Sequence, residues 1–166
     1  EFRRVLFRSD ATNAEAVERI YKLKRSENKK SMLMLCASAD MVVRYVNKAP
    51  GIAFEVMELA TSPLTAILPG AAGVAENLIP EERTLGVRIP DHEFCRRILR
   101  GLGRPVVSTS ANISGEATPA GLAEVSREII DGVDFVVNPR FEGKPTKKAS
   151  SIIAFGEGGE VKIIRE

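Results

Sequence analysis

Side chains that could bind a ligand crowd one stretch of this sequence, Arg104–Pro119 (RPVVSTSANISGEATP). The apolar run Pro105–Val107 predicts the end of a buried strand, and hydroxyls and an amide follow it directly. Thr118 and Pro119 are typical of a helix N-cap and the first helical residue. Loops between a strand end and a helix start bind ligands in open α/β sheets, and their neutral donors suit an anion such as phosphate. The same composition is equally typical of an ordinary polar loop.

Two polar residues inside apolar strands are further candidates. Thr65 lies in the middle of the predicted strand 63–68, and Arg88 is the single charge in the predicted strand 84–90. Because an unpaired buried charge is rare, such an arginine lies either at the edge of the sheet or faces an anion. The sequence leaves both alternatives open.

The elements that must position these side chains follow from the hydrophobic pattern. Helical spacing predicts helices over residues 12–24, with Thr12 as the N-cap, and over 40–46, 50–60, 93–102 and 119–130. Shorter apolar runs predict strands over 31–38, 63–68, 84–90, 105–107 and 133–137, and a closing hairpin of 150–155 with 160–165. We therefore predict an α/β fold, a single domain with a twisted mixed β-sheet and flanking helices.

Composition narrows the class of protein. The chain has 166 residues, 44% of them hydrophobic and 28% charged, which is typical of one soluble globular domain. Its net charge of +2 does not point to nucleic acid, and its apolar runs fall short of the roughly 20 residues that span a bilayer. Cys36 and Cys95 are typical of reduced, buried thiols, which favours a cytoplasmic location. We expect no membrane as a partner. No spacing of Cys and His predicts a metal site.

Residues 1–9 (EFRRVLFRS) mix arginines with apolar side chains and match nothing that follows. They are either a short strand or helix, or sequence that is foreign to the protein. We favour the second interpretation, and we expect a non-native or unrelated segment over 1–9 and one domain over 10–166.

Six segments carry a family resemblance through their order and spacing. They are Asp10–Asn13, Ile20–Lys24, Pro63–Thr65, Leu85–Pro90, Ser108–Gly115 and Ser150–Arg165. Together they resemble the YrdC-like family of threonylcarbamoyl-AMP synthases, whose fold is YrdC/RibB-like. The resemblance implies a nucleotidyltransferase that forms L-threonylcarbamoyladenylate and pyrophosphate from L-threonine, bicarbonate and ATP. It also implies Mg²⁺ carried on the nucleotide, and downstream machinery that transfers the threonylcarbamoyl group to adenosine 37 of tRNA.

The resemblance implies roles for single residues. Lys24 matches the lysine of a lysine–any–arginine motif and is expected to be catalytic at the phosphates. The arginine position holds Ser26, so either the adjacent Arg25 takes over that catalytic role or a phosphate contact is lost. Ser108 falls where the family binds threonine. The expected nucleotide-binding residues are Lys24, Lys30, Thr65, Ser110, Asn112, Thr118 and Arg165, with Ser150 and Ser151 as weaker candidates. Alternatively, Thr65 and Ser150 only satisfy polar groups at strand ends.

One departure concerns the start of the chain. The family has a strand and a threonine-pocket loop before the position of Asp10, where EFRRVLFRS stands here. We therefore expect this chain to bind ATP but to make little or no adenylate, because in-line attack requires a positioned carbamate. The run Val5–Phe7 could pair with the sheet edge as a substitute strand.

An alternative hypothesis is a double-stranded RNA or tRNA-binding module without catalysis. Its basic surface would consist of Lys24, Arg25, Lys29, Lys30, Arg140, Lys144 and Lys147. Phosphate contacts of this kind make binding fall steeply with salt. The small net charge makes this hypothesis weaker than the enzyme.

Overall fold

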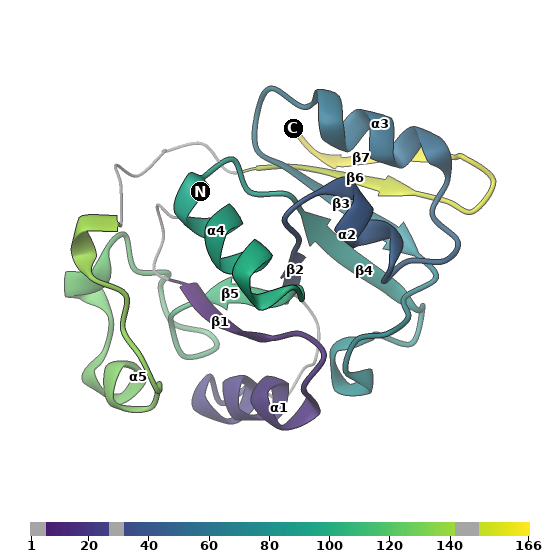
Figure 1. Cartoon of the computed structure of the whole chain (residues 1–166). Helices are drawn as coiled ribbons and strands as arrows, with labels where there is room; N and C mark the ends of the chain where they lie inside the picture. Colours follow the sequence, from purple (N-terminus) through teal and green to yellow (C-terminus); the bar gives the residue numbers. More distant parts are fainter. Residues whose placement is uncertain (1–5, 27–31, 142–149) are drawn as a thin grey trace.

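The computed structural model describes residues 6–26, 32–141 and 150–166, which form one mixed β-sheet with helices around it (Figure 1). The strands are β1 (Leu6–Asp10), β2 (Leu33–Leu35), β3 (Leu64–Pro69), β4 (Thr84–Arg88), β5 (Val106–Ser110), β6 (Ser151–Phe155) and β7 (Val161–Arg165). The helices are α1 (Ala14–Leu23), α2 (Ala39–Val43), α3 (Gly51–Leu59), α4 (Glu93–Leu102) and α5 (Arg127–Asp131). Three short 3₁₀ turns cover Glu76–Leu78, Leu122–Glu124 and Pro139–Phe141.

The sheet is mixed, as predicted. Its strand order is β1-β5-β2-β4-β3-β6-β7. The β2/β4 and β3/β6 pairs are parallel and the other four pairs are antiparallel, including the terminal hairpin of β6 and β7. This arrangement confirms the predicted fold class.

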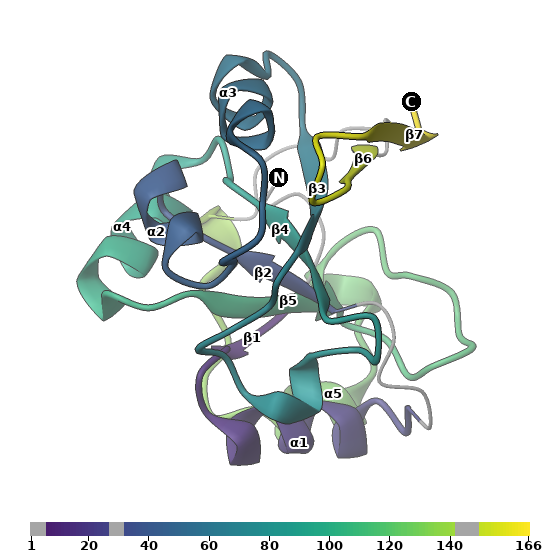
Figure 2. The ribbon, with the colours of Figure 1, turned by 90° about the vertical axis from the view of Figure 1, so that its right-hand side faces the viewer.

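The core lies around the centre of the sheet. Met34 pairs with Val107 on one side and with Val87 on the other, and all three side chains are completely buried. In Figure 2, α2 and α4 lie on one side of the sheet, α3 lies above it, and α1 and α5 lie below it. The loop that follows β5 extends to the side opposite α2 and α4.

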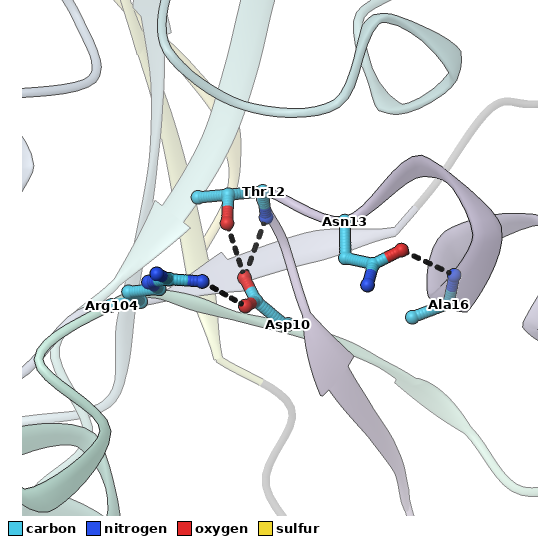
Figure 3. A network of polar contacts seen from close by, with 5 residues as sticks. All are labelled: Asp10, Thr12, Asn13, Ala16 and Arg104. Carbon is cyan, nitrogen blue, oxygen red and sulfur yellow. Dashed lines mark hydrogen bonds and ion pairs between the residues drawn. The ribbon is translucent and has the colours of Figure 1, made fainter.

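Helix α1 begins one residue later than predicted, after a polar network that Figure 3 shows. Asn13, not Thr12, is the N-cap, and its Oδ1 accepts from the backbone N–H of Ala16 at 3.0 Å. Thr12 instead donates to Asp10 from its backbone N–H at 2.8 Å and from its Oγ1 at 2.6 Å. Arg104, just before β5, pairs with the other oxygen of Asp10 at 3.1 Å, which joins the start of α1 to β5.

Two predicted elements in the segment after β5 are wrong. The expected helix 119–130 is a 3₁₀ turn followed by the short helix α5. Gly121 is extended before the turn (φ −158°, ψ 172°), and Val125 and Ser126, with non-helical ψ angles of 131° and 147°, separate the turn from α5. Thr118 is therefore not a helix cap. The expected strand 133–137 has no partner among the described strands, and Phe135 in it is 79% exposed. Two apolar side chains of this segment, Val125 and Ile129, are nevertheless buried in the core.

Strand β1 overlaps the segment expected to be foreign. Leu6–Asp10 pairs antiparallel with β5, from Leu6 opposite Ser110 to Asp10 opposite Val106. The alternative of a short strand is thus confirmed for these residues, and so is the idea that this run occupies a sheet edge. The division into 1–9 and 10–166 stays a prediction.

Candidate functional site

The buried end of α1 meets the polar loop after β5. Lys24, the residue after α1, is only 7% exposed. Its Nζ donates to the main-chain carbonyl of Ser110 at 2.6 Å and to that of Asn112 at 2.7 Å. In return, the N–H of Ser114 donates to the carbonyl of Lys24 at 2.8 Å. The structure therefore brings together three predicted site residues, Lys24, Ser110 and Asn112. Lys24 lies more than eighty residues before the other two in the chain.

A polar cavity of about 210 Å³ opens at this junction. Its lining combines one cation with hydroxyls and an amide, and consists of Tyr21, Lys24, Ser26, Met32, Thr109, Ser110, Asn112, Ser114 and Gly115. The Nδ2 of Asn112 donates to the carbonyls of Ile113 and Glu116, which holds the loop closed. The Oδ1 of Asn112 is buried and has no hydrogen-bond partner among the described residues.

Burial lowers the pKa of Lys24 from its ordinary value, because the ammonium is removed from water. The two carbonyl oxygens that it contacts are neutral hydrogen-bond acceptors. A buried cation held in this way attracts an anion to the cavity.

A second group of predicted residues meets on β3, β4, β6 and β7. The guanidinium of Arg88 donates from Nε to Thr65 Oγ1 at 3.1 Å and from Nη2 to Ser150 Oγ. Arg165 donates to the carbonyl of Ser150 from Nε at 2.9 Å and from Nη2 at 2.7 Å. Thr65 and Ser150 are buried, with 2% and 7% of their surface exposed. Ser150 thus lies between two guanidinium groups, which makes this cluster a second place for an anion.

The sequence left two alternatives for Arg88, a position at the edge of the sheet or one that faces an anion. The strand order excludes the first. β4 lies between β2 and β3, so Arg88 is not on an edge strand. The resemblance gave Arg88 no role, and the signal that could have identified it was its isolated charge within an apolar strand. The alternative expected the hydroxyls of Thr65 and Ser150 to form hydrogen bonds within the sheet. They do so by accepting from the Arg88 guanidinium.

Strand register places Ser108 on the same face of the sheet as the Arg88 cluster. The side chains of Thr65 and Arg88 lie on one face of the sheet. Their neighbours Ala66 and Val87 pair in the antiparallel β3/β4 ladder, which puts Thr65 opposite Arg88. Ser108 pairs with Leu33, and the Leu33 side chain leans over Gly86, where a Cβ would lie 2.8 Å from its Cδ2. Ser108, 4% exposed, therefore shares the face of Arg88, with Leu33 between them. This shared face can hold the two ends of one extended ligand.

Other predicted residues lie elsewhere. Arg25 turns to Glu128 of α5, with its Nη2 2.8 Å and 2.9 Å from the two carboxylate oxygens. Thr118 is exposed in the loop after β5 and is not part of the cavity lining described above. Ser151 begins β6, where it pairs with Leu64. Lys30 lies outside the described residues, as do Lys29, Lys144 and Lys147 of the alternative basic surface.

A larger cavity of about 400 Å³ lies between α1, α4, α5 and the segment 133–141. Its walls are mostly apolar, with Leu35, Leu99 and Ile129 among the lining residues. It lacks the dense set of donors that a triphosphate requires, so we place the candidate site at the polar cavity and the Arg88 cluster.

The described residues, 6–26, 32–141 and 150–166, contain neither a candidate metal cluster nor a candidate membrane span. No group of three or more His, Cys, Asp and Glu side chains in this part of the chain could hold a metal ion. None of its helices is both long enough and apolar enough to cross a membrane.

Comparison with known proteins identifies the family of the chain. A sequence model of the Sua5/YciO/YrdC family, described as "Telomere recombination", matches residues 7–166. The threonylcarbamoyl-AMP synthase of Idiomarina loihiensis is 32% identical over 143 residues, which cover 83% of this chain and 77% of that protein.

Solved structures show the same fold. P. abyssi Sua5, solved in complex with L-threonine, matches with a TM-score of 0.77 and 24% identity, over 89% of this chain and 43% of that chain. This chain therefore spans less than half of that longer protein. E. coli YciO matches with a TM-score of 0.77 and 22% identity, over 97% of this chain and 77% of that chain.

Proposed function

Because the chain belongs to the Sua5/YciO/YrdC family, we propose that it is a threonylcarbamoyl-AMP synthase. In this reaction the amine of L-threonine condenses with bicarbonate to a carbamate with loss of water. A carbamate oxygen then attacks the α-phosphorus of ATP and expels pyrophosphate. The observation that carries the proposal is the buried Lys24 ammonium, fixed between the carbonyls of Ser110 and Asn112 at the wall of a polar cavity.

The polar cavity suits the nucleotide. Nucleotidyl transfer requires that charge on the triphosphate be neutralised and that the reactants be held in line, and little covalent work falls to the protein. Lys24 supplies the positive charge, and the hydroxyls of Ser110 and Ser114 supply neutral donors. The free Oδ1 of Asn112 is placed to accept from the nucleoside.

The Arg88 cluster suits the carboxylate of threonine. A guanidinium binds carboxylates through paired hydrogen bonds, and Arg88 is held in place by the hydroxyls of Thr65 and Ser150. Arg165, on the other side of Ser150, would contact the nucleotide. Ser108, on the same face, would bind the amino-acid end of the carbamate, as the resemblance implies.

Mg²⁺ would arrive on the nucleotide rather than on a resident site. When bound with the nucleotide it would neutralise phosphate charge, while Lys24 and the hydroxyls of Ser110 and Ser114 would hold the phosphates. The protein side chains nearest the cavity are donors rather than carboxylates, which fits a metal that keeps phosphate and water as its ligands.

Location and partners are part of the same proposal. Cys36 and Cys95 are free and buried, which supports a reducing compartment such as the cytoplasm. The adenylate would pass to machinery that modifies tRNA. RNA binding without catalysis is less well supported, since a net charge of +2 gives only a weak electrostatic attraction for nucleic acid.

The test is threonine-dependent pyrophosphate release from ATP, with bicarbonate present and with enzyme at a concentration close to that of ATP. We expect the pyrophosphate that is released to depend on threonine. Release at the same rate without threonine would refute the proposal.

A further inference from the structure

Two ion pairs and one close contact join α1 to α5 and the residues after it. Arg19 pairs with Asp134 at 2.9 Å, and Arg25 pairs with Glu128 at 2.8 Å. Between them, Gly132 lies so close to Leu23 that a Cβ on the glycine would be 2.5 Å from Leu23 Cδ1. The two segments thus run past each other in opposite directions, with an arginine–carboxylate pair at each end.

Arg25 lies in the chain between two residues of the candidate nucleotide cavity. Lys24 and Ser26, the neighbours of Arg25 in the chain, both line that cavity. Arg25 has the uncommon left-handed backbone conformation, with φ 50°, and its side chain extends to Glu128. A cation close in the chain to the candidate phosphate site is therefore paired with a carboxylate.

We propose that Glu128 is a positioning residue that holds Arg25 at the mouth of the cavity and gives it up to the phosphates of the nucleotide. The inference rests on the proposed function, because it takes a triphosphate as the ligand. Arg25 and Glu128 are 65% and 48% exposed at their side chains, and ion pairs this exposed are weak. A triphosphate carries several charges, so it can replace the single carboxylate, and the freed Glu128 remains solvated.

The exchange predicts that Glu128 competes with phosphate for Arg25. In Glu128→Gln the competing charge is gone, so the affinity for inorganic tripolyphosphate and for ATP should rise about two- to fivefold. Glu128→Asp keeps the carboxylate and should return the dissociation constant toward the wild-type value. Asp134→Asn is the matched control, since it breaks the equivalent pair with Arg19 and should leave the dissociation constant unchanged.

Isothermal titration calorimetry of the full chain with tripolyphosphate tests the exchange. Adding Arg25→Met to Glu128→Gln should cancel the gain, because the gain comes through Arg25. An unchanged or lower affinity in Glu128→Gln would overturn the proposal, as would a gain that survives Arg25→Met. An equal gain in Asp134→Asn would also overturn it, because general loss of negative charge would then explain both.

These outcomes separate the exchange from the proposed function. Tripolyphosphate binding does not require threonine or bicarbonate, so the exchange can fail while threonine-dependent pyrophosphate release still occurs. If neither the wild type nor Glu128→Gln binds tripolyphosphate, the exchange is wrong, and the threonine-dependent assay then decides the function independently.

Discussion

The Nζ of Lys24 donates to the main-chain carbonyl of Ser110 at 2.6 Å, which ties the end of α1 to the end of β5. The bond joins the one buried lysine among the described residues to the hydroxyl-rich loop. It fixes the ammonium at the wall of the polar cavity before any ligand arrives. Preorganised charge of this kind acts without a cost of reorganisation during the reaction.

Lys24→Met tests the role of this charge. Methionine keeps much of the side-chain volume but removes the cation, so the affinity for ATP should fall at least about tenfold. The melting temperature should change by only a few degrees, because the lost hydrogen bonds are offset by the ammonium that no longer has to be buried. Lys48→Met is the control, since Lys48 is 57% exposed and pairs with Glu157 in the β6–β7 turn. Equal losses of affinity in both variants would contradict the assignment.

Arg88→Lys tests the carboxylate site. Lysine keeps the charge but cannot contact Thr65 and Ser150 with the planar geometry of the guanidinium. Threonine-dependent turnover should fall roughly tenfold or more, mainly through a higher KM for threonine, while tripolyphosphate affinity stays unchanged. Arg100→Lys, on the exposed last turn of α4, should alter neither quantity. A loss of tripolyphosphate affinity in Arg88→Lys would instead place Arg88 at the phosphates.

Gly132→Ala tests the close packing of α1 on α5. The new Cβ would lie 2.5 Å from Leu23 Cδ1 and 3.1 Å from the carbonyl of Glu128, so we expect a destabilisation of about 1–3 kcal/mol in urea unfolding. Gly101→Ala is the matched control within α4, where a Cβ meets nothing within 4 Å. That variant should be more stable by about 0.5–1 kcal/mol. An increase in stability for both variants would show that Leu23 yields easily.

Asp10 gives a prediction about pH. Partial burial opposes its charge, but hydrogen bonds from Thr12 and the Arg104 guanidinium hold the pKa of Asp10 below its ordinary value of 3.8. The charged form therefore stabilises the fold at pH values above 3.8, and this contribution is lost as the pH falls through the lowered pKa.

Asp10→Asn should therefore be less stable than the wild type by about 1 kcal/mol at neutral pH. The difference should shrink toward zero in acid, and urea unfolding at several pH values measures it. Glu55→Gln, on the exposed side of α3, should show no such trend. A difference between Asp10→Asn and the wild type that is constant with pH would contradict the role of the charge.

Local signals made much of the fold predictable. α4 occupies the predicted residues 93–102, since its apolar stripe and its terminal Gly103, left-handed with φ 67°, are both encoded nearby. The β6–β7 hairpin was predicted from a Gly-rich turn between two apolar runs. The helix expected over 119–130 failed because helical spacing of apolar residues does not show that Gly121, Val125 and Ser126 have non-helical backbone angles.

The site was predictable as a set of residues, but its contacts were not. The resemblance grouped Lys24 with Ser110 and Asn112, and the structure brings these three together. The partner of Arg25 could not be predicted, because Glu128 lies 103 residues away on a helix that the sequence placed differently. Whether Arg25 contacts phosphate stays a prediction, as do the roles of Lys30 and Thr118.

The measurement that most directly tests the proposed function is a single-turnover reaction with ATP, L-threonine and ¹³C-labelled bicarbonate, analysed by mass spectrometry. We expect the wild type to form labelled threonylcarbamoyl-adenylate together with pyrophosphate, slowly. The product should be absent without threonine and absent in Lys24→Met. ATP turnover that proceeds equally without threonine, or that gives ADP in place of pyrophosphate, would contradict it.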